Sequence, residues 1–209
     1  MNAEAADPYD ALAPHYRSFA SGRAAYLAAV DAFVRENLPP APRSLLDVGS
    51  GDGVRAMALA ASCSIGRVVL SDASAAMVER CRALGAADVW AVPAQDLPAT
   101  ETFDVVTCLW NVLGHVPGRV ARLAALRRMR EALAPGGRLF LDVQNRHNAA
   151  GYGWWRVLGR IALDALMPDE RRGDTSFDWR IADKTLRGHG HLFTPAEVSS
   201  LLREAGLRP

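Results

Sequence analysis

The sequence predicts an α/β fold with a doubly wound, mostly parallel sheet that helices cover on both faces. Between residues 44 and 145, short β-branched runs alternate with longer helical patterns. A right-handed crossover places each connecting helix on a face of the sheet, so this alternation favours parallel strands. The chain has 209 residues and half of them are hydrophobic, which is enough for one core. We therefore expect a single domain over residues 1–209.

Two helices, over 9–20 and 23–37, are expected before the sheet, and the proline-rich linker LPPAPR follows them. Five strands come next, with helices over 54–62, 74–85 and 119–133 between them. The predicted strands are SLLDVG, RVVLS, DVWAV, FDVVTCLW and RLFLDV, the last of them after the turn APGG. Ser74 is expected to cap its helix and Gly85 to end it. In such sheets, ligands bind at the carboxyl ends of the strands.

Composition limits the kinds of partner. The formal net charge is +1, so no global field attracts nucleic acid or an anionic membrane. Cys63, Cys81 and Cys108 share no CxxC spacing, which favours buried thiols in a reducing compartment over disulfides or a zinc site. The sequence shows no signal-peptide pattern and no apolar run of membrane-spanning length. We expect a cytoplasmic protein with no membrane partner and no metal.

A glycine-rich loop follows the first strand, with Asp47, Gly49, Gly51 and Gly53 at alternate positions. The dinucleotide fingerprint GxGxxG requires a third glycine where this chain has Val54, which argues against an NAD-dependent oxidoreductase.

A carboxylate, Asp72, ends the second strand 21 residues past Gly51, where it can accept hydrogen bonds from both hydroxyls of a ribose.

This loop, DxGxGxG, resembles motif I of the class I S-adenosylmethionine-dependent methyltransferases, which have a Rossmann-like fold. Four further segments match the family in order and spacing: Asp72 in VVLSDAS, PAQDLP as the adenine loop, FDVVTCLWNVLGHV and LAPGGRLFLDV. Together they cover residues 44–145, the expected cofactor-binding core. The resemblance implies methyl transfer from S-adenosylmethionine to an oxygen, nitrogen or carbon of a small-molecule acceptor by in-line displacement, with S-adenosylhomocysteine as the product.

The resemblance also implies a set of cofactor-binding residues. In that set, Asp47 holds the loop by accepting backbone N–H groups, and the Ala94 amide with Gln95 or Asp96 contacts the base. Within residues 1–43, the expected lid, Tyr9, Tyr16 and Arg17 are candidates for the cofactor carboxylate. The expected cofactor-binding residues are Tyr16, Asp47, Gly49, Ser50, Gly51, Asp72, Ala73, Met77, Ala94, Gln95, Asp96, Leu109 and Trp110.

Methyl transfer requires alignment and desolvation more than a catalytic group, so neither a metal nor a catalytic dyad is obligatory. His115, in NVLGHV after the fourth strand, is the candidate base, and a purely structural role is its alternative.

Acceptor specificity is expected in residues 146–193, which the family core does not include. Tyr152, Trp154 and Trp155 are candidates for the floor of a pocket for a flat or apolar acceptor, although they could instead bury a helix or form a dimer contact. TSFDWRI and TLRGHGHLF predict a hairpin over the active-site edge. His189 and His191 share one strand face, which fits a polar lining or a surface hairpin better than a metal pair. The candidate acceptor-binding residues are Asn111, His147, Tyr152, Trp154 and His191.

The last expected element is a helix within residues 194–209, with Thr194 as N-cap, Glu197 completing a capping box and Gly206 after its end. The family's sheet continues with two more strands that are missing here. We favour a longer native chain over coverage of that sheet edge by another element such as the hairpin.

Two other function classes stay open. Arg122, Arg127, Arg128 and Arg130 crowd one helix, as in a methyltransferase acting on tRNA or another nucleic acid, although such a face is more often simply solvated. A non-catalytic protein that binds S-adenosylmethionine would also carry motif I. We expect a small-molecule enzyme that is a monomer or a homodimer.

Overall fold

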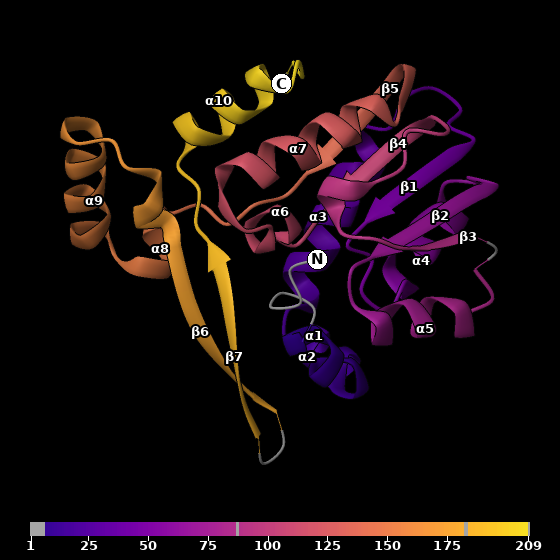
Figure 1. The fold of residues 1–209 in the computed structure, drawn as a ribbon, viewed down its shortest axis with the longest axis horizontal. Coiled ribbons are helices and arrows are strands. Elements are labelled where there is room, and N and C mark those ends of the chain that lie inside the picture. Colours follow the sequence, from indigo (N-terminus) through magenta and orange to yellow (C-terminus); the bar gives the residue numbers. More distant parts are fainter. Residues whose placement is uncertain (1–6, 87, 182–183, 209) are drawn as a thin grey trace.

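The computed structural model describes residues 7–86, 88–181 and 184–208. Its centre is a five-stranded sheet in the order β3-β2-β1-β4-β5, and every pair of neighbours is parallel (Figure 1). The order reverses between β1 and β4, so the carboxyl ends of these strands border a crevice. The predicted doubly wound fold is confirmed. The strands are β1 Ser44–Val48, β2 Arg67–Asp72, β3 Asp88–Ala91, β4 Phe103–Cys108 and β5 Leu133–Leu141.

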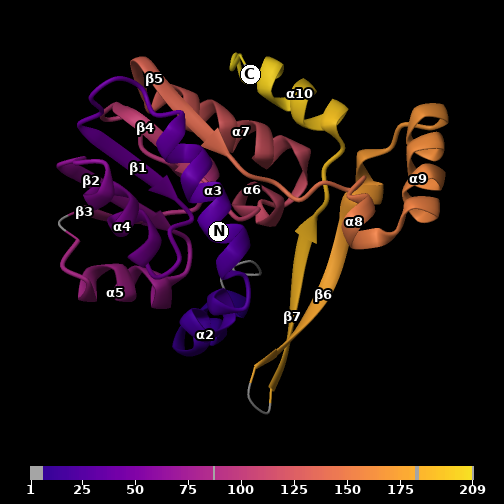
Figure 2. The ribbon, with the colours of Figure 1, turned by 180° about the vertical axis from the view of Figure 1, so that it is seen from behind.

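Helices cover both faces of the sheet (Figures 1 and 2). Leu45 of β1 packs in a cluster with residues of α3, α4 and α5, whereas the next residue, Leu46, packs with residues of α7 and α10. Both faces are therefore buried, which explains why the strand sequences are almost continuously apolar. These helices are α3 Ala24–Glu36, α4 Val54–Ser62, α5 Ala75–Ala83, α7 Gly118–Glu131 and α10 Pro195–Glu204.

The first predicted helix is divided into three short pieces: α1 Asp7–Leu12, the 3-10 turn η1 Ala13–His15 and α2 Tyr16–Ser21. Pro14 lies in the 3-10 turn, where its missing N–H and its ring interrupt a continuous helix. The carboxylate of Asp10 accepts a hydrogen bond of 3.1 Å from the amide of Ala76, at the start of α5. The N-terminal segment is thereby attached to the sheet domain.

Residues after β5 form α8 Ala149–Tyr152, α9 Trp154–Leu166, the 3-10 turn η3 Glu170–Gly173 and the hairpin β6 Asp174–Ile181 with β7 Lys184–His191. The predicted hairpin is confirmed, and it makes a two-stranded antiparallel sheet of its own. Among the described residues, no second strand pairs with β5, so the hairpin does not cover that edge.

Two local predictions need correction. The turn APGG is a bulge inside β5, because the pairing with β4 shifts between Phe103 and Val105. A short helix, α6 Val112–His115, occupies the loop after β4.

A buried histidine joins the hairpin to the last helix. The ring of His191 is 1% exposed; its Nδ1 lies 2.7 Å from a carboxylate oxygen of Asp174 and its Nε2 lies 2.8 Å from one of Glu197. Thr194 caps α10 as predicted, by accepting a hydrogen bond of 3.1 Å from the amide of Glu197. The side chain of Glu197, however, turns to the buried imidazole instead of completing the capping box.

Ser74 accepts a hydrogen bond from the amide of Met77 and so caps α5, and Gly85 and Gly206 follow α5 and α10 with positive φ, as predicted.

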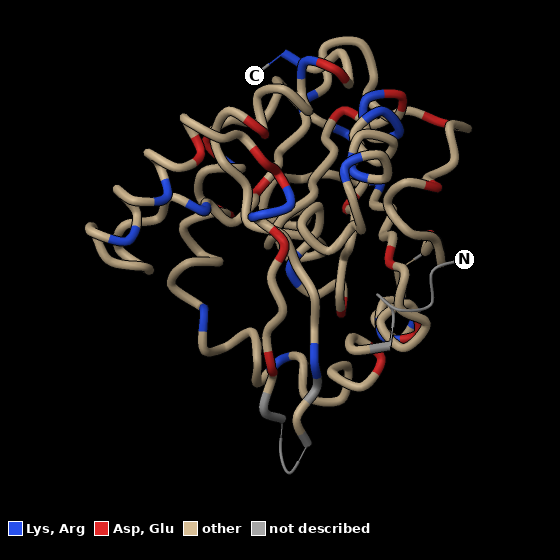
Figure 3. Tube along the Cα trace, turned by 60° about the vertical axis from the view of Figure 1, so that its left-hand side comes forward, with Lys and Arg blue, Asp and Glu red and all other residues tan. Residues whose placement is uncertain are grey.

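Lys and Arg are interspersed with Asp and Glu along the chain trace (Figure 3). None of the helices built from described residues is long and apolar enough to cross a membrane.

Helix α7 offers a test of how the hydrophobic core is packed. Leu126 is fully buried against the sheet, whereas Val120 on the same helix is 85% exposed. Leu126→Ala removes buried methyl groups and leaves a cavity, so the free energy of unfolding should fall by about 2–5 kcal/mol. Val120→Ala, the control, should change it by less than about 0.5 kcal/mol. Denaturant unfolding measures both, and equal effects would contradict this packing.

Candidate functional site

A cavity of about 1200 Å³ opens at the carboxyl ends of the strands, between the sheet, the N-terminal helices and the hairpin. It brings together ten of the thirteen predicted cofactor-binding residues. These are Tyr16, Gly49, Gly51, Asp72, Ala73, Ala94, Gln95, Asp96, Leu109 and Trp110. The other three, Asp47, Ser50 and Met77, are buried outside the cavity wall.

The glycine loop is fixed to the end of β2, because the amides of Gly49 and Ser50 both donate to the carbonyl of Ser71, at 2.7 and 2.9 Å. Gly51 has φ +56°, and a Cβ atom there would lie 2.5 Å from the hydroxyl oxygen of Tyr16. The loop therefore has to be bare at Gly51 because the N-terminal segment lies directly over it.

Asp47 supports the site in a different way from the one predicted. Its carboxylate accepts a hydrogen bond of 2.5 Å from the hydroxyl of Thr107 on β4, rather than bonds from loop amides. Burial raises the pKa of Asp47, and the hydrogen bond from Thr107 works against that rise. Asp47 thus joins β1 to β4 beneath the glycine loop.

Asp72 lies in the cavity wall and is held by two backbone amides. Its carboxylate oxygens accept hydrogen bonds from the amides of Gly51, at 2.8 Å, and Ser74, at 2.9 Å. Burial raises its pKa to about 6, and these amide bonds oppose the rise. A carboxylate has about four lone-pair positions, so about two remain for other donors. That capacity fits the two hydroxyls of a ribose.

The predicted adenine loop forms the 3-10 turn η2 Ala94–Asp96, closed by a hydrogen bond of 2.9 Å from the Asp96 amide to the Pro93 carbonyl. Gln95 and Asp96 line the cavity, and their side chains form no hydrogen bond with another described residue. Their polar atoms are available to a ligand.

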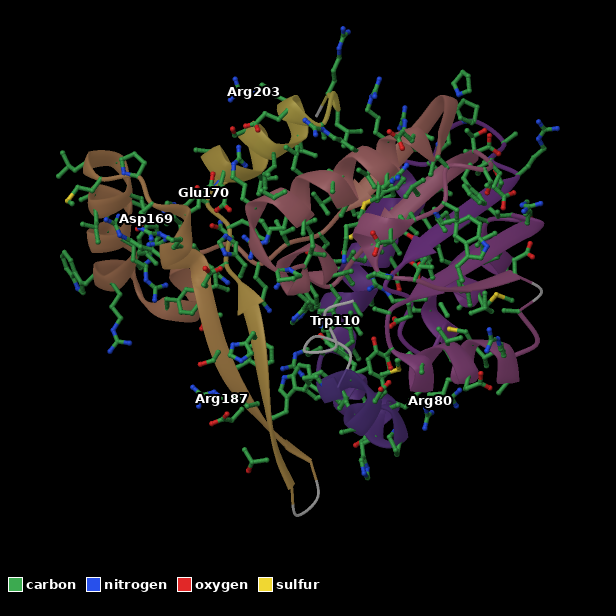
Figure 4. The ribbon with its side chains drawn as sticks, in the orientation of Figure 1. Arg80, Trp110, Asp169, Glu170, Arg187 and Arg203 are labelled. Atoms are coloured by element: carbon green, nitrogen blue, oxygen red, sulfur yellow. The ribbon has the colours of Figure 1, made fainter. Side chains whose placement is uncertain are left out.

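After β4, Trp110 and Asn111 both adopt left-handed backbone conformations, with φ of +59° and +61°. The Trp110 amide donates to the carboxylate of Asp142 at 2.9 Å, and the side-chain oxygen of Asn111 accepts from the amide of Gln144 at 2.9 Å. Figure 4 shows Trp110 between the sheet and the N-terminal helices. Its ring stacks on Phe19 of α2 with the ring centres 5.8 Å apart.

An arginine that no sequence pattern indicated, Arg23, lies in this part of the cavity wall. The guanidinium carbon of Arg23 is 4.5 Å from the ring centre of Phe19 and 6.0 Å from that of Trp110. The predicted Arg17 lies outside the cavity wall and instead pairs with Asp52 at 3.1 Å. Arg17 and Arg23 both lie in the N-terminal segment, and the helical spacing of the sequence does not show which of them lines the cavity.

His115 lines the cavity at the end of α6. Its Nδ1 lies 2.9 Å from the backbone carbonyl of His189, and a carbonyl only accepts, so Nδ1 donates. Burial lowers the pKa of His115, which favours the neutral ring, and the bond to His189 opposes this shift. Its Nε2 forms no hydrogen bond with the described residues, so the neutral ring has an acceptor free.

The acceptor candidates separate into two groups. Asn111, Tyr152 and His191 line the cavity, but both ring nitrogens of His191 are already bonded to carboxylates. His147 and Trp154 lie outside the cavity wall. His147 binds Asp164 at 2.9 Å, and Trp154 is 71% exposed on α9.

Three aromatic residues complete the wall on the hairpin side. Tyr9 packs edge-on against His115 and Trp179, at 5.4 and 5.1 Å between ring centres, and Trp179 lies 4.9 Å from Phe177. The alternation of Phe177 and Trp179 in TSFDWRI was the sequence signal for a shared strand face. Within the residues that the structure describes, no group of three His, Cys, Asp or Glu side chains could hold a metal.

A family model described as a methyltransferase domain matches residues 16–209. The chain belongs to the methyltransferase family. The methyltransferase is 31% identical over 180 residues to the ubiquinone biosynthesis O-methyltransferase of Thiobacillus denitrificans, a match that covers 84% of this chain and 68% of that protein. It is 39% identical over 116 residues to the cypemycin N-terminal methyltransferase of a Streptomyces species, covering 53% and 46%.

Among solved structures, it resembles S-adenosylmethionine-bound CalS10, an amino pentose methyltransferase from Micromonospora echinaspora, with a TM-score of 0.64 and 22% identity over 91% of this chain and 87% of that one. The predictions of a class I methyltransferase and of S-adenosylmethionine as its methyl donor are confirmed. The methyltransferase is an enzyme rather than a binding module. Asp72, with hydrogen-bonding capacity to spare, and the bare glycine loop fit this cofactor.

The raised pKa of Asp72 predicts how the stability of the fold depends on pH. Its folded pKa of about 6 lies above the ordinary 3.8, so the folded protein binds more protons than the unfolded chain between these values. This carboxylate therefore lowers stability as pH rises through that window. Asp72→Asn removes this titration, so stability should fall less than in wild type as pH rises through the window. An amide has a single acceptor oxygen, so one of the bonds from Gly51 and Ser74 is lost, and calorimetry should show S-adenosylhomocysteine binding weakened about 10- to 150-fold. Unchanged affinity would rule out the ribose contact.

Gly51→Ala tests the loop. The new Cβ would displace Tyr16, and φ +56° is strained for alanine, so S-adenosylhomocysteine affinity should fall more than about 10-fold and stability by about 1 kcal/mol or more. Gly66→Ala is the control, because a Cβ atom there meets nothing within 4 Å. Calorimetry that found native affinity in Gly51→Ala would place the cofactor elsewhere.

Proposed function

We propose that the methyltransferase transfers a methyl group to an oxygen or nitrogen of a small, flat acceptor, with His115 as the general base. The observation that carries this proposal is a neutral His115 in the cavity wall whose Nε2 forms no hydrogen bond with the described residues. Oxygen and nitrogen nucleophiles lose a proton on methylation, and a neutral imidazole within reach can take it.

The cofactor supplies the electrophilic methyl group, and the protein supplies alignment, desolvation and the base. Asp72, the glycine loop and the turn at Gln95 would hold its nucleoside. Trp110, Tyr16 and Arg23 would surround its amino-acid end. The bond from His115 to the His189 carbonyl fixes the ring, so that its basic nitrogen does not have to be oriented during the reaction.

Two observations support the acceptor class. Tyr9, Phe177 and Trp179 give the cavity flat apolar walls, which suit a ring. The names of the relatives give O-methylation in ubiquinone biosynthesis, methylation of an amino pentose and N-terminal methylation of cypemycin. Small acceptors with a nucleophilic oxygen or nitrogen are common to these chemistries.

A nucleic-acid acceptor receives less support. Arg122, one of the four clustered arginines named above, is 4% exposed and donates to the carbonyl of Val116 at 3.0 Å. Arg128 pairs with Glu131 at 3.0 Å. Two of these four arginines therefore use their guanidinium groups in bonds within the protein, which leaves the helix poorly suited to bind phosphates.

The remaining expectations stay proposals. The first is a single domain over residues 1–209, made of the lid (1–43), the cofactor-binding core (44–145), the acceptor segment (146–193) and the last helix (194–209). The others are a cytoplasmic location and a monomeric or homodimeric state. Large exposed apolar side chains on α9, such as Trp155 at 87% exposure, favour the homodimer of these two states.

His115→Asn tests the base. Turnover of a responsive acceptor, from a panel of phenols, amino sugars and short peptides, should fall about 10²- to 10⁴-fold while S-adenosylhomocysteine affinity stays within about twofold. In wild type, the acidic limb of the pH–rate profile should have its midpoint below about 6.5, because burial lowers the His115 pKa. His189→Gln, whose backbone carbonyl is unchanged, is the control. Full activity in His115→Asn would show that His115 is not the general base.

A further inference from the structure

The structure assigns to Arg160 the recognition of an acidic group, a carboxylate or a phosphate, on the acceptor. This inference rests on the proposed function, because it concerns the acceptor end of the same cavity. Arg160 lies on α9 and lines the cavity. It was not among the residues expected from the sequence.

The guanidinium of Arg160 is held in place but has donors to spare. One Nη donates to the carbonyl of Arg146 at 3.2 Å, and the central carbon lies 4.6 Å from the ring centre of Tyr152. A guanidinium has five N–H donors, and this is its only hydrogen bond to the described residues. No carboxylate of the described chain lies within 4.0 Å of it, although Asp178 lines the same cavity from the hairpin.

The acidic residue closest along the helix is already neutralised. Asp164, one turn from Arg160, has Arg146 at 2.9 Å, His147 at 2.9 Å and Arg172 at 3.6 Å from its oxygens. Two arginines share this single carboxylate before Arg160 is counted. Asp164 is therefore committed to these partners and does not pair with Arg160, whose remaining donors are available to an anionic ligand.

The chemistry of arginine decides the ligand class. Its planar fork of donors matches carboxylate and phosphate oxygens in a bidentate geometry that lysine cannot reproduce. Stacking on Tyr152 orients that fork. Arg23 lies with Phe19 and Trp110 at the N-terminal side of the cavity, which leaves Arg160 for the acceptor.

The test uses the full chain saturated with S-adenosylhomocysteine and three probes of similar shape: benzoate, phenyl phosphate and benzamide. We expect calorimetry to show benzoate or phenyl phosphate binding at least about 10-fold more tightly than benzamide. The comparison of the two anions identifies which acidic group fits. Arg160→Gln should abolish this preference, so that the three probes bind about equally. Arg160→Lys should retain part of the preference.

Arg156→Gln is the matched control, because Arg156 is exposed on the same helix outside the cavity wall. It should keep the wild-type preference. His115→Asn should keep it as well, so a failure of the proposed base is distinguishable from a failure of this inference. Equal binding of the three probes to wild type, or a preference that survives in Arg160→Gln, would overturn the assignment. So would a loss of S-adenosylhomocysteine affinity in Arg160→Gln, because it would assign the residue to the cofactor.

Discussion

The turn after β4 is the constraint on which the site depends. Two consecutive residues with side chains, Trp110 and Asn111, hold left-handed conformations that cost about 1–3 kcal/mol each. Asp142 offsets this cost by accepting the Trp110 amide on its carboxylate and the Asn111 amide on its carbonyl. The turn directs Trp110 toward α2, Asn111 toward β7 and the following helix toward the cavity. Without it, Trp110 and His115 would not reach one cavity.

The hairpin side of the cavity depends on contacts between side chains rather than on the sheet. His191 connects β7 to Asp174 of β6 and to Glu197 of α10. Burial raises the pKa of Asp174, but the hydrogen bonds and charges of His191 and Arg122 outweigh it and leave that pKa lowered. The hairpin is thus held at its base by ionic hydrogen bonds, while aromatic rings on its inner face meet the N-terminal helices.

The sequence was sufficient for the sheet and for the glycine-loop end of the cavity, because both rest on short-range patterns. The glycine spacing, Asp72 and the cap at Ser74 each express a local geometric requirement. The end of the cavity formed by α9 and the hairpin was predicted less well. The amphipathic pattern of α9 shows two faces but not which one turns inward, and here Arg160 and Asp164 face the protein while Trp154 is exposed. Likewise, no sequence pattern indicated that the hydrogen-bonding capacity of His191 would be used by two carboxylates.

This difference between the two ends has a physical origin. The glycine-loop end is made of strand termini and loop amides, and a change in one strand would disturb its neighbours through the ladder of hydrogen bonds. The opposite end is made of α9, the hairpin and the N-terminal helices, which meet through rings and single ion pairs such as that of Arg122 with Asp174. Substitutions at Phe177, Trp179 or Arg160 therefore alter shape and charge in the cavity while the sheet is untouched. A fold divided in this way can change its acceptor without changing how it binds the methyl donor.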